Sequence, residues 1–137
     1  MNDYVDLALK FIGVHYVWGG NNPLSGLDCS GMVCECLRSF GYIGKADHSA
    51  SSLYFHLLAA GWVHGVGRGS VLFFGPNTDN INHIAFGLND KLMVESGGGD
   101  RNTINKKEAE KIGAYVRIRP IINRRDLVAS LVPGGLK

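Results

Sequence analysis

The sequence has 137 residues, of which 45% are hydrophobic and 19% are charged, and its formal net charge is +2 at pH 7. This length supports one domain with a single core, and the composition is that of a folded soluble protein. The small net charge argues against a nucleic-acid partner, and no apolar stretch approaches the ~18 residues of a membrane span.

Residues 3–13 are predicted to form an amphipathic helix. Its apolar stripe consists of Tyr4, Leu7, Ala8 and Phe11. Because Asp3, Asp6 and Lys10 interrupt the apolar run, this segment does not resemble a signal peptide. We therefore expect a protein that is made in the cytoplasm and, if it acts outside the cell, is exported without a cleavable leader.

A glycine-rich loop at 14–28 is followed by a second predicted helix, which begins at Cys29 and can end at Gly41. Its apolar positions are Cys29, Met32, Val33, Cys36, Leu37 and Phe40. Asp28 precedes this helix and is predicted to be its N-cap. A third helix fits residues 49–61, with Ser49 or Ser51 as the cap.

Beyond this point the hydrophobic period changes to that of strands. Strands are predicted at 70–75, 83–88, 92–96 and 114–120, and residues 123–132 are interpreted as a closing helix. Helices followed by consecutive strands indicate an α+β fold, with an antiparallel sheet and helices segregated from it. We expect residues 1–137 to form one domain.

The three cysteines, Cys29, Cys34 and Cys36, are an odd number and do not suggest a disulfide framework. Cys34 and Cys36 are not a usual pair of zinc ligands, and the histidines lack the spacing of a partner pair. We therefore expect reduced thiols, no metal and no cofactor, and we assign no role to Cys34 or Cys36.

Cys29 is predicted to lie in the first turn of its helix, where unpaired backbone amides and the helix dipole favour negative charge. We expect this position to depress the pKa of the thiol and to favour its nucleophilic thiolate form. The same amides could bind an oxyanion. The alternative is that Cys29 simply belongs to the buried apolar stripe that includes Cys36.

His83 begins a predicted strand, and Glu95 follows twelve residues later on the next strand. A two-residue turn would mix polar and apolar side chains on both faces, whereas a three-residue loop at 88–90 sorts the faces and places His83 directly opposite Glu95. The other pairs it predicts are Phe86 with Leu92, Ile84 with Val94 and Ala85 with Met93. A carboxylate in contact with an imidazole fixes its tautomer and raises its basicity. Alternatively, His83 and Glu95 are two unrelated surface residues.

With these residues assembled, the sequence resembles the NlpC-type cell-wall peptidases, a papain-like family. The resemblance rests on Tyr16, the Gly19–Gly20 pair, "GLDCSG" at 26–31, and a histidine followed twelve residues later by a polar residue. It implies hydrolysis of an amide in peptidoglycan stem peptides, typically between γ-linked D-Glu and a diamino acid.

The resemblance also implies roles for individual residues. Cys29 would attack the amide, His83 would transfer the proton and Glu95 would orient His83. Tyr16 would bind the oxyanion or substrate, although a tyrosine packed under the loop is equally consistent with the sequence. Ser30 would line the pocket, and Asp28 would cap the helix that bears the nucleophile. The peptide substrate is the expected partner, and the sequence leaves the oligomeric state open.

Two features depart from the family pattern: Ser70, and a looser form of the family's strand-turn in "FGLND" at 86–90, which we also expect to lie near the substrate cleft. Ser70 in "GRGSVLFF" stands where the family often has an acidic residue, and we expect this position to lie near the substrate cleft. "SGGGD" at 96–100 is expected to be a flexible loop beside that cleft rather than a phosphate-binding loop. The alternatives to a peptidase are an acyltransferase or amidase with the same Cys–His pair, and an inactive module that binds wall peptides. Delivery by a phage or as a secreted effector is the expected route to the wall.

Overall fold

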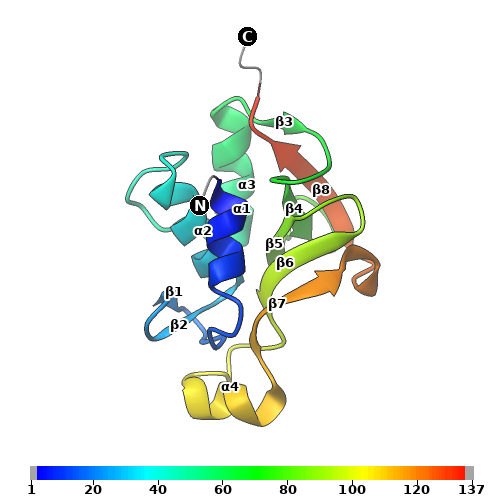
Figure 1. Cartoon of the computed structure of the whole chain (residues 1–137). Coiled ribbons are helices and arrows are strands. Elements are labelled where there is room, and N and C mark those ends of the chain that lie inside the picture. Colours follow the sequence, from blue (N-terminus) through cyan, green and yellow to red (C-terminus); the bar gives the residue numbers. More distant parts are fainter. Residues whose placement is uncertain (1–2, 135–137) are drawn as a thin grey trace.

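The computed structural model describes residues 3–134 and has helices on one side of a curved antiparallel sheet (Figure 1). The helices are α1 (Tyr4–Lys10), α2 (Cys29–Ser39), α3 (Ala50–Ala59) and α4 (Lys106–Ile112), with a 3-10 turn η1 (Ile121–Asn123). The main sheet is formed by β3 (Val63–His64), β4 (Val71–Phe74), β5 (His83–Gly87), β6 (Leu92–Gly97), β7 (Tyr115–Pro120) and β8 (Leu127–Val132). Its strand order is β3-β8-β4-β5-β6-β7. The predicted α+β class is confirmed.

The principal core lies between the helices and one face of the sheet. Its fully buried members include Val5, Met32, Leu37 and Leu53 from the helices, and Phe73, Ile84, Phe86 and Val94 from the strands. The alternate residues of the same strands point to the opposite face, where Leu72, Phe74, Ala85 and Met93 form a smaller cluster with Ile121 of η1. His83 and Glu95 belong to this second face by strand alternation, so these two side chains are separated from the helix-packed core.

The helix predicted at 123–132 is wrong, because residues 127–132 form strand β8. This strand pairs with β4 on one side and with β3 on the other. Ala129 and Leu131 alternate toward the core, which is the period of a strand and not of a helix. The short apolar run is compatible with the period of a helix and with that of a strand. It forms a strand because the edge of β4 that does not pair with β5 is free to bind it.

The helix starts follow local capping chemistry. Asp28 caps α2 by accepting a hydrogen bond from the backbone N–H of Gly31 at 2.6 Å, and Ser49 caps α3 by accepting from that of Ser52 at 3.1 Å. Both predicted caps are confirmed. Helix α4 was not predicted, although Asn105 caps it and Gly113 ends it in the left-handed conformation. It lies at the end of the molecule beyond β6 and β7 (Figure 1).

The glycine-rich loop is anchored on the first turn of α2. It contains a short hairpin of β1 (Asn21–Asn22) and β2 (Gly26–Leu27), and the carbonyl of Gly20 accepts a hydrogen bond from the backbone N–H of Asp28 at 3.0 Å. The same carbonyl packs against Gly31, where a Cβ atom would overlap it. Gly31 is therefore required for the close approach between the loop and the helix that starts at Cys29.

This close approach predicts a stability difference between two glycine substitutions. Gly31→Ala should lower the free energy of unfolding by about 1–3 kcal/mol, because the new methyl group displaces the loop backbone. Gly44→Ala is the matched control, since nothing lies within 4 Å of the added atom, and it should change stability by less than about 0.5 kcal/mol. Urea denaturation measures both, and equal stabilities would contradict the packing described.

Candidate active site

Cys29 is the first residue of α2, and this partly buried residue lies between two hollows in the surface. The sheet-side cleft has a volume of about 540 Å³, and its lining includes Cys29, His83, Glu95, Arg117, Arg119 and Arg124. The helix-side cleft has a volume of about 450 Å³, and its lining includes Trp18, Asp28, Cys29, Ser30 and Ala50. Tyr16 lines both. Trp18 and Asn82 also line both, so the thiol lies where two adjoining clefts meet.

The environment of Cys29 corrects the prediction of a depressed pKa. Burial raises the pKa of this thiol to about 12, and the charge of Asp28 acts in the same direction. Backbone N–H groups of Ser30, Ile84 and Cys29 itself lower it, but burial outweighs them. The resting side chain is therefore a neutral thiol, and its nucleophilic form requires a base that accepts the proton.

His83 and Glu95 are both buried, and Nε2 of His83 lies 2.7 Å from Oε1 of Glu95. The predicted contact is confirmed. Because an ionised carboxylate only accepts hydrogen bonds, this contact selects the tautomer with the proton on Nε2 and leaves Nδ1 as the basic nitrogen. The backbone N–H of Ile84, the next residue, acts on the Cys29 sulfur, so the start of β5 adjoins the nucleophile.

The predicted register of this hairpin is wrong by two residues. Phe86 pairs with Val94 and Gly87 with Met93, which places Glu95 diagonally to His83 and not directly opposite. The loop has the predicted three residues, but they are 89–91, because the side chain of Asn89 accepts hydrogen bonds from the backbone of Lys91 and Leu92 at 2.8 Å each. An even shift preserves the face of every side chain, which is why the His83–Glu95 contact survives the error.

Arg117 is a member of the site that sequence reasoning missed. It lies opposite Glu95 in the β6–β7 register, and its Nε donates to Oε2 of Glu95 at 3.0 Å. Gly97 and Gly98 give the guanidinium and carboxylate room, since a Cβ on Gly97 would lie 2.8 Å from Oε2 of Glu95. The alternation of arginines in the predicted strand 114–120 was the available signal, but it does not identify the partner strand.

The charge on Glu95 is determined by these two partners. Burial alone would raise the pKa of its carboxyl group, but the hydrogen bond and charge of His83, followed by those of Arg117, outweigh burial and lower the pKa. Glu95 is therefore ionised at neutral pH. One carboxylate oxygen faces the imidazole and the other faces the guanidinium, so each oxygen is held in place by its own partner.

Asp28, Ser30 and Tyr16 lie around the nucleophile in different ways. The Asp28 carboxylate accepts from the backbone N–H of Gly19 and Gly31 and from the hydroxyl of Ser30, so it fastens the glycine-rich loop to α2. Tyr16 is buried and its ring packs against the position of Gly99. Burial raises the pKa of the Tyr16 phenol, and the nearby Cys29 contributes, so the hydroxyl remains a hydrogen-bond donor at neutral pH. Their roles toward a substrate remain predictions.

Three parts of the sequence were predicted to lie near the substrate cleft, and only one of them does. Residues 97–100 line the sheet-side cleft, as predicted for the "SGGGD" segment. Ser70 does not lie there: its carbonyl accepts from the backbone N–H of Gly87, at the opposite end of β5 from His83. Ser70 and the "FGLND" turn at 86–90 therefore lie at the end of β5 away from His83, and neither lines the sheet-side cleft, contrary to the expectation.

The remaining thiols lie in the core. Cys36 is fully buried, and the Cys34 thiol donates a weak hydrogen bond to the carbonyl of His48 at 3.8 Å. Among residues 3–134, no group of three or more His, Cys, Asp or Glu side chains is arranged to hold a metal ion. Of the helices in the described part of the chain, none combines the length and apolar character needed to cross a membrane.

Comparison with known proteins identifies the family of this chain. Residues 13–119 match a sequence profile described as the NlpC/P60 family. This chain is a member of that family. It is 32% identical over 127 residues to peptidoglycan endopeptidase RipA of Mycobacterium tuberculosis, covering 83% of this chain and 23% of that protein. It is 30% identical over 95 residues to the bifunctional muramidase/DL-endopeptidase CwlT of Bacillus subtilis, covering 65% and 27%.

The chain thus spans about a quarter of the length of these curated relatives. Among solved structures, it resembles the NlpC/p60 domain of peptidoglycan hydrolase SagA with a TM-score of 0.67 and 21% identity, over 93% of this chain and 94% of that one. This likeness confirms the predicted papain-like arrangement, in which helices pack on an antiparallel sheet.

The pairing of Glu95 predicts a characteristic acid dependence of stability. A carboxyl group with a lowered pKa in the folded state contributes stability that is fully present above its ordinary value of 4.5 and is lost as pH falls through the folded value. Between about pH 5 and about pH 3, the wild type should therefore lose more unfolding free energy than Glu95→Gln. Glu110→Gln, which changes a carboxylate that is 68% exposed, is the control. Parallel curves for the wild type and Glu95→Gln in urea denaturation would refute the ionised, paired Glu95.

Proposed function

We propose that this chain is a cysteine peptidase that hydrolyses an amide bond in peptidoglycan stem peptides, between γ-linked D-Glu and a diamino acid. The observation that carries this proposal is the Arg117–Glu95–His83 arrangement beside Cys29, at the meeting point of two clefts. Membership of the NlpC/P60 family and the endopeptidase names of its relatives supply the substrate class.

The first chemical step joins the Cys29 sulfur to the substrate carbonyl carbon. The thiol proton passes to Nδ1 of His83, the nitrogen that Glu95 leaves unprotonated, as the sulfur forms its bond. The electron pair of the carbonyl moves onto its oxygen. Because burial raises the pKa of Cys29, this proton transfer is a necessary part of the attack. The imidazolium that results is stabilised by Glu95, whose charge is in turn held by Arg117.

The oxyanion needs hydrogen-bond donors that are already in position. The backbone N–H groups of Cys29 and Ser30 at the start of α2 act on the sulfur, and their helix N-terminus favours negative charge. Tyr16 adds a neutral phenol that lines both clefts. We assign the oxyanion site to this group of donors, with Asp28 holding the loop and helix in register.

Collapse of the intermediate breaks the carbon–nitrogen bond, and the His83 imidazolium gives its proton to the departing amine. The acyl group remains on Cys29 as a thioester. Water then attacks the thioester while His83 accepts a proton from it, the carbon–sulfur bond breaks, and the thiolate recovers that proton. No cofactor enters the atom balance of either half-reaction.

Digestion of purified peptidoglycan sacculi tests the proposal. The wild type should release fragments with new amino groups on the diamino acid, and Cys29→Ala should release none, as identified by mass spectrometry. Glu95→Gln should lower kcat by at least about 100-fold with a smaller effect on KM, because the imidazole loses its orientation and charge partner.

Cys34→Ala is the matched control, since it removes a buried thiol on the same helix away from the sheet-side cleft, and it should retain activity. Sacculi that remain intact but retain the bound protein would overturn the peptidase in favour of a binding module. Transfer of the acyl group to an added amine in preference to water would instead identify an acyltransferase.

A further inference from the structure

Three arginines line the sheet-side cleft, and Arg119 differs from the other two. Arg117 is paired with Glu95 at 3.0 Å, and Arg124 forms a bidentate pair with Asp126 at 3.0 and 2.7 Å. Nη1 of Arg119 is 4.0 Å from Oε2 of Glu95, which is beyond hydrogen-bond distance. Among the described residues, Arg119 is therefore the cleft arginine that donates no hydrogen bond to a carboxylate, and its ion pair with Glu95 is a long one.

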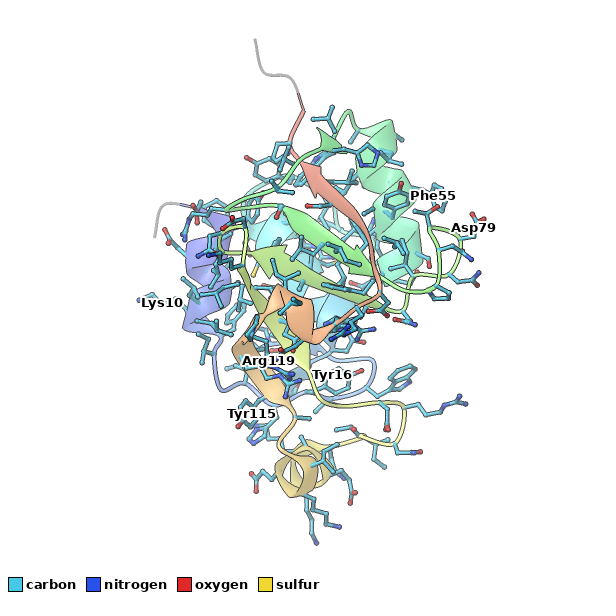
Figure 2. All side chains as sticks on the ribbon, turned by 90° about the vertical axis from the view of Figure 1, so that its right-hand side faces the viewer. Lys10, Tyr16, Phe55, Asp79, Tyr115 and Arg119 are labelled. Carbon is cyan, nitrogen blue, oxygen red and sulfur yellow. The ribbon has the colours of Figure 1, made fainter. Side chains whose placement is uncertain are left out.

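Arg119 is nevertheless held in a defined orientation. With the Asn123 amide turned so that its oxygen faces the guanidinium, that oxygen accepts from Nη2 at 3.1 Å and from Nε at 3.2 Å. Nη1 and the second N–H of Nη2 then remain as a parallel pair of donors, the edge of a guanidinium that binds a carboxylate through two hydrogen bonds. Figure 2 shows Arg119 and Tyr16 on the same face of the molecule, and both line the sheet-side cleft.

The position of His83 indicates which part of a substrate meets Arg119. His83 lines the sheet-side cleft and is absent from the lining of the helix-side cleft. The group that protonates a leaving amine must contact that amine, so the leaving part of the substrate occupies the sheet-side cleft. The acyl part then extends into the helix-side cleft, along Asp28 and Ser30.

We propose that Arg119, oriented by Asn123, forms a subsite for a free carboxylate on the leaving amino acid of the substrate. This inference rests on the proposed amide hydrolysis and specifies its selectivity. The wild type would favour substrates whose leaving amino acid carries an unmodified carboxylate over substrates in which that group is an amide. Placed on the cleft edge of β7, the side chain of Arg119 is 37% exposed, so a ligand reaches it without rearrangement of the sheet.

A carboxylate on the leaving amino acid can come from two sources, and paired substrates distinguish them. The first pair is L-Ala-γ-D-Glu-L-Lys with a free α-carboxylate or with an α-amide. The second pair is L-Ala-γ-D-Glu-diaminopimelic acid with the α-carboxyl amidated throughout and the side-chain carboxylate either free or amidated. Values of kcat/KM are measured by release of the amino acid, for the wild type, Arg119→Gln, Arg119→Lys and Arg125→Gln.

In at least one pair, the wild type should favour the free carboxylate by roughly 10- to 100-fold, the range expected for a charge-assisted, bidentate contact. Arg119→Gln should remove that preference by slowing the carboxylate substrate alone, and Arg119→Lys should restore part of it. Arg125→Gln makes the same change in charge on an exposed neighbour outside the sheet-side cleft, and should keep the preference. The pair that shows the preference identifies the carboxylate.

Two results would overturn the subsite while leaving the peptidase intact. The first is equal cleavage of both members of each pair by the wild type. The second is an equal loss by Arg119→Gln on carboxylate and amide substrates, which would mean that Arg119 acts only through the charge of Glu95. Absence of cleavage for all four peptides, together with intact sacculi, would instead contradict the proposed function itself.

Discussion

The contact between His83 and Glu95 is the interaction on which the rest of the site depends. A carboxylate that is almost completely buried is costly unless its charge is paired, and here it has a partner on each side: His83 from β5 and Arg117 from β7. Three adjacent strands must therefore be in register for Glu95 to remain ionised. The same condition fixes the imidazole tautomer, so the stability of the sheet and the chemistry of the site are linked.

The nucleophile is supported by a separate set of interactions. Asp28 uses its carboxylate to join Gly19, Ser30 and Gly31, which brings the glycine-rich loop against the start of α2. Burial leaves Cys29 as a neutral thiol, so reactivity depends on the imidazole at the start of β5 and not on the helix terminus alone. The two halves of the site thus come from different layers of the fold, and the packing of α2 on β5 brings them together.

Local chemistry made much of this predictable. Asp28 before an amphipathic run identifies the start of α2, and the alternation of side chains restricts His83 and Glu95 to one face, whichever even register the hairpin adopts. Features that depend on distant packing were not predictable in the same way. The strand at 127–132 is determined by the free edge of β4, and the Arg117–Glu95 pair is determined by a β6–β7 register whose strands are separated by α4. The prediction of a depressed pKa for Cys29 was wrong for a similar reason, because the burial of a side chain is a property of the assembled fold.

The central claim is that Glu95 leaves Nδ1 of His83 as the base, and the tautomer of that ring tests it most directly. In the Cys29→Ala variant, labelled with isotopic nitrogen in its histidines, magnetic resonance at a pH where the imidazole is neutral should show the proton of His83 on Nε2, assigned by comparison with His83→Gln. In the Cys29→Ala, Glu95→Gln double variant this preference should weaken. A His83 ring that carries its proton mainly on Nδ1 while Glu95 is present would contradict the account.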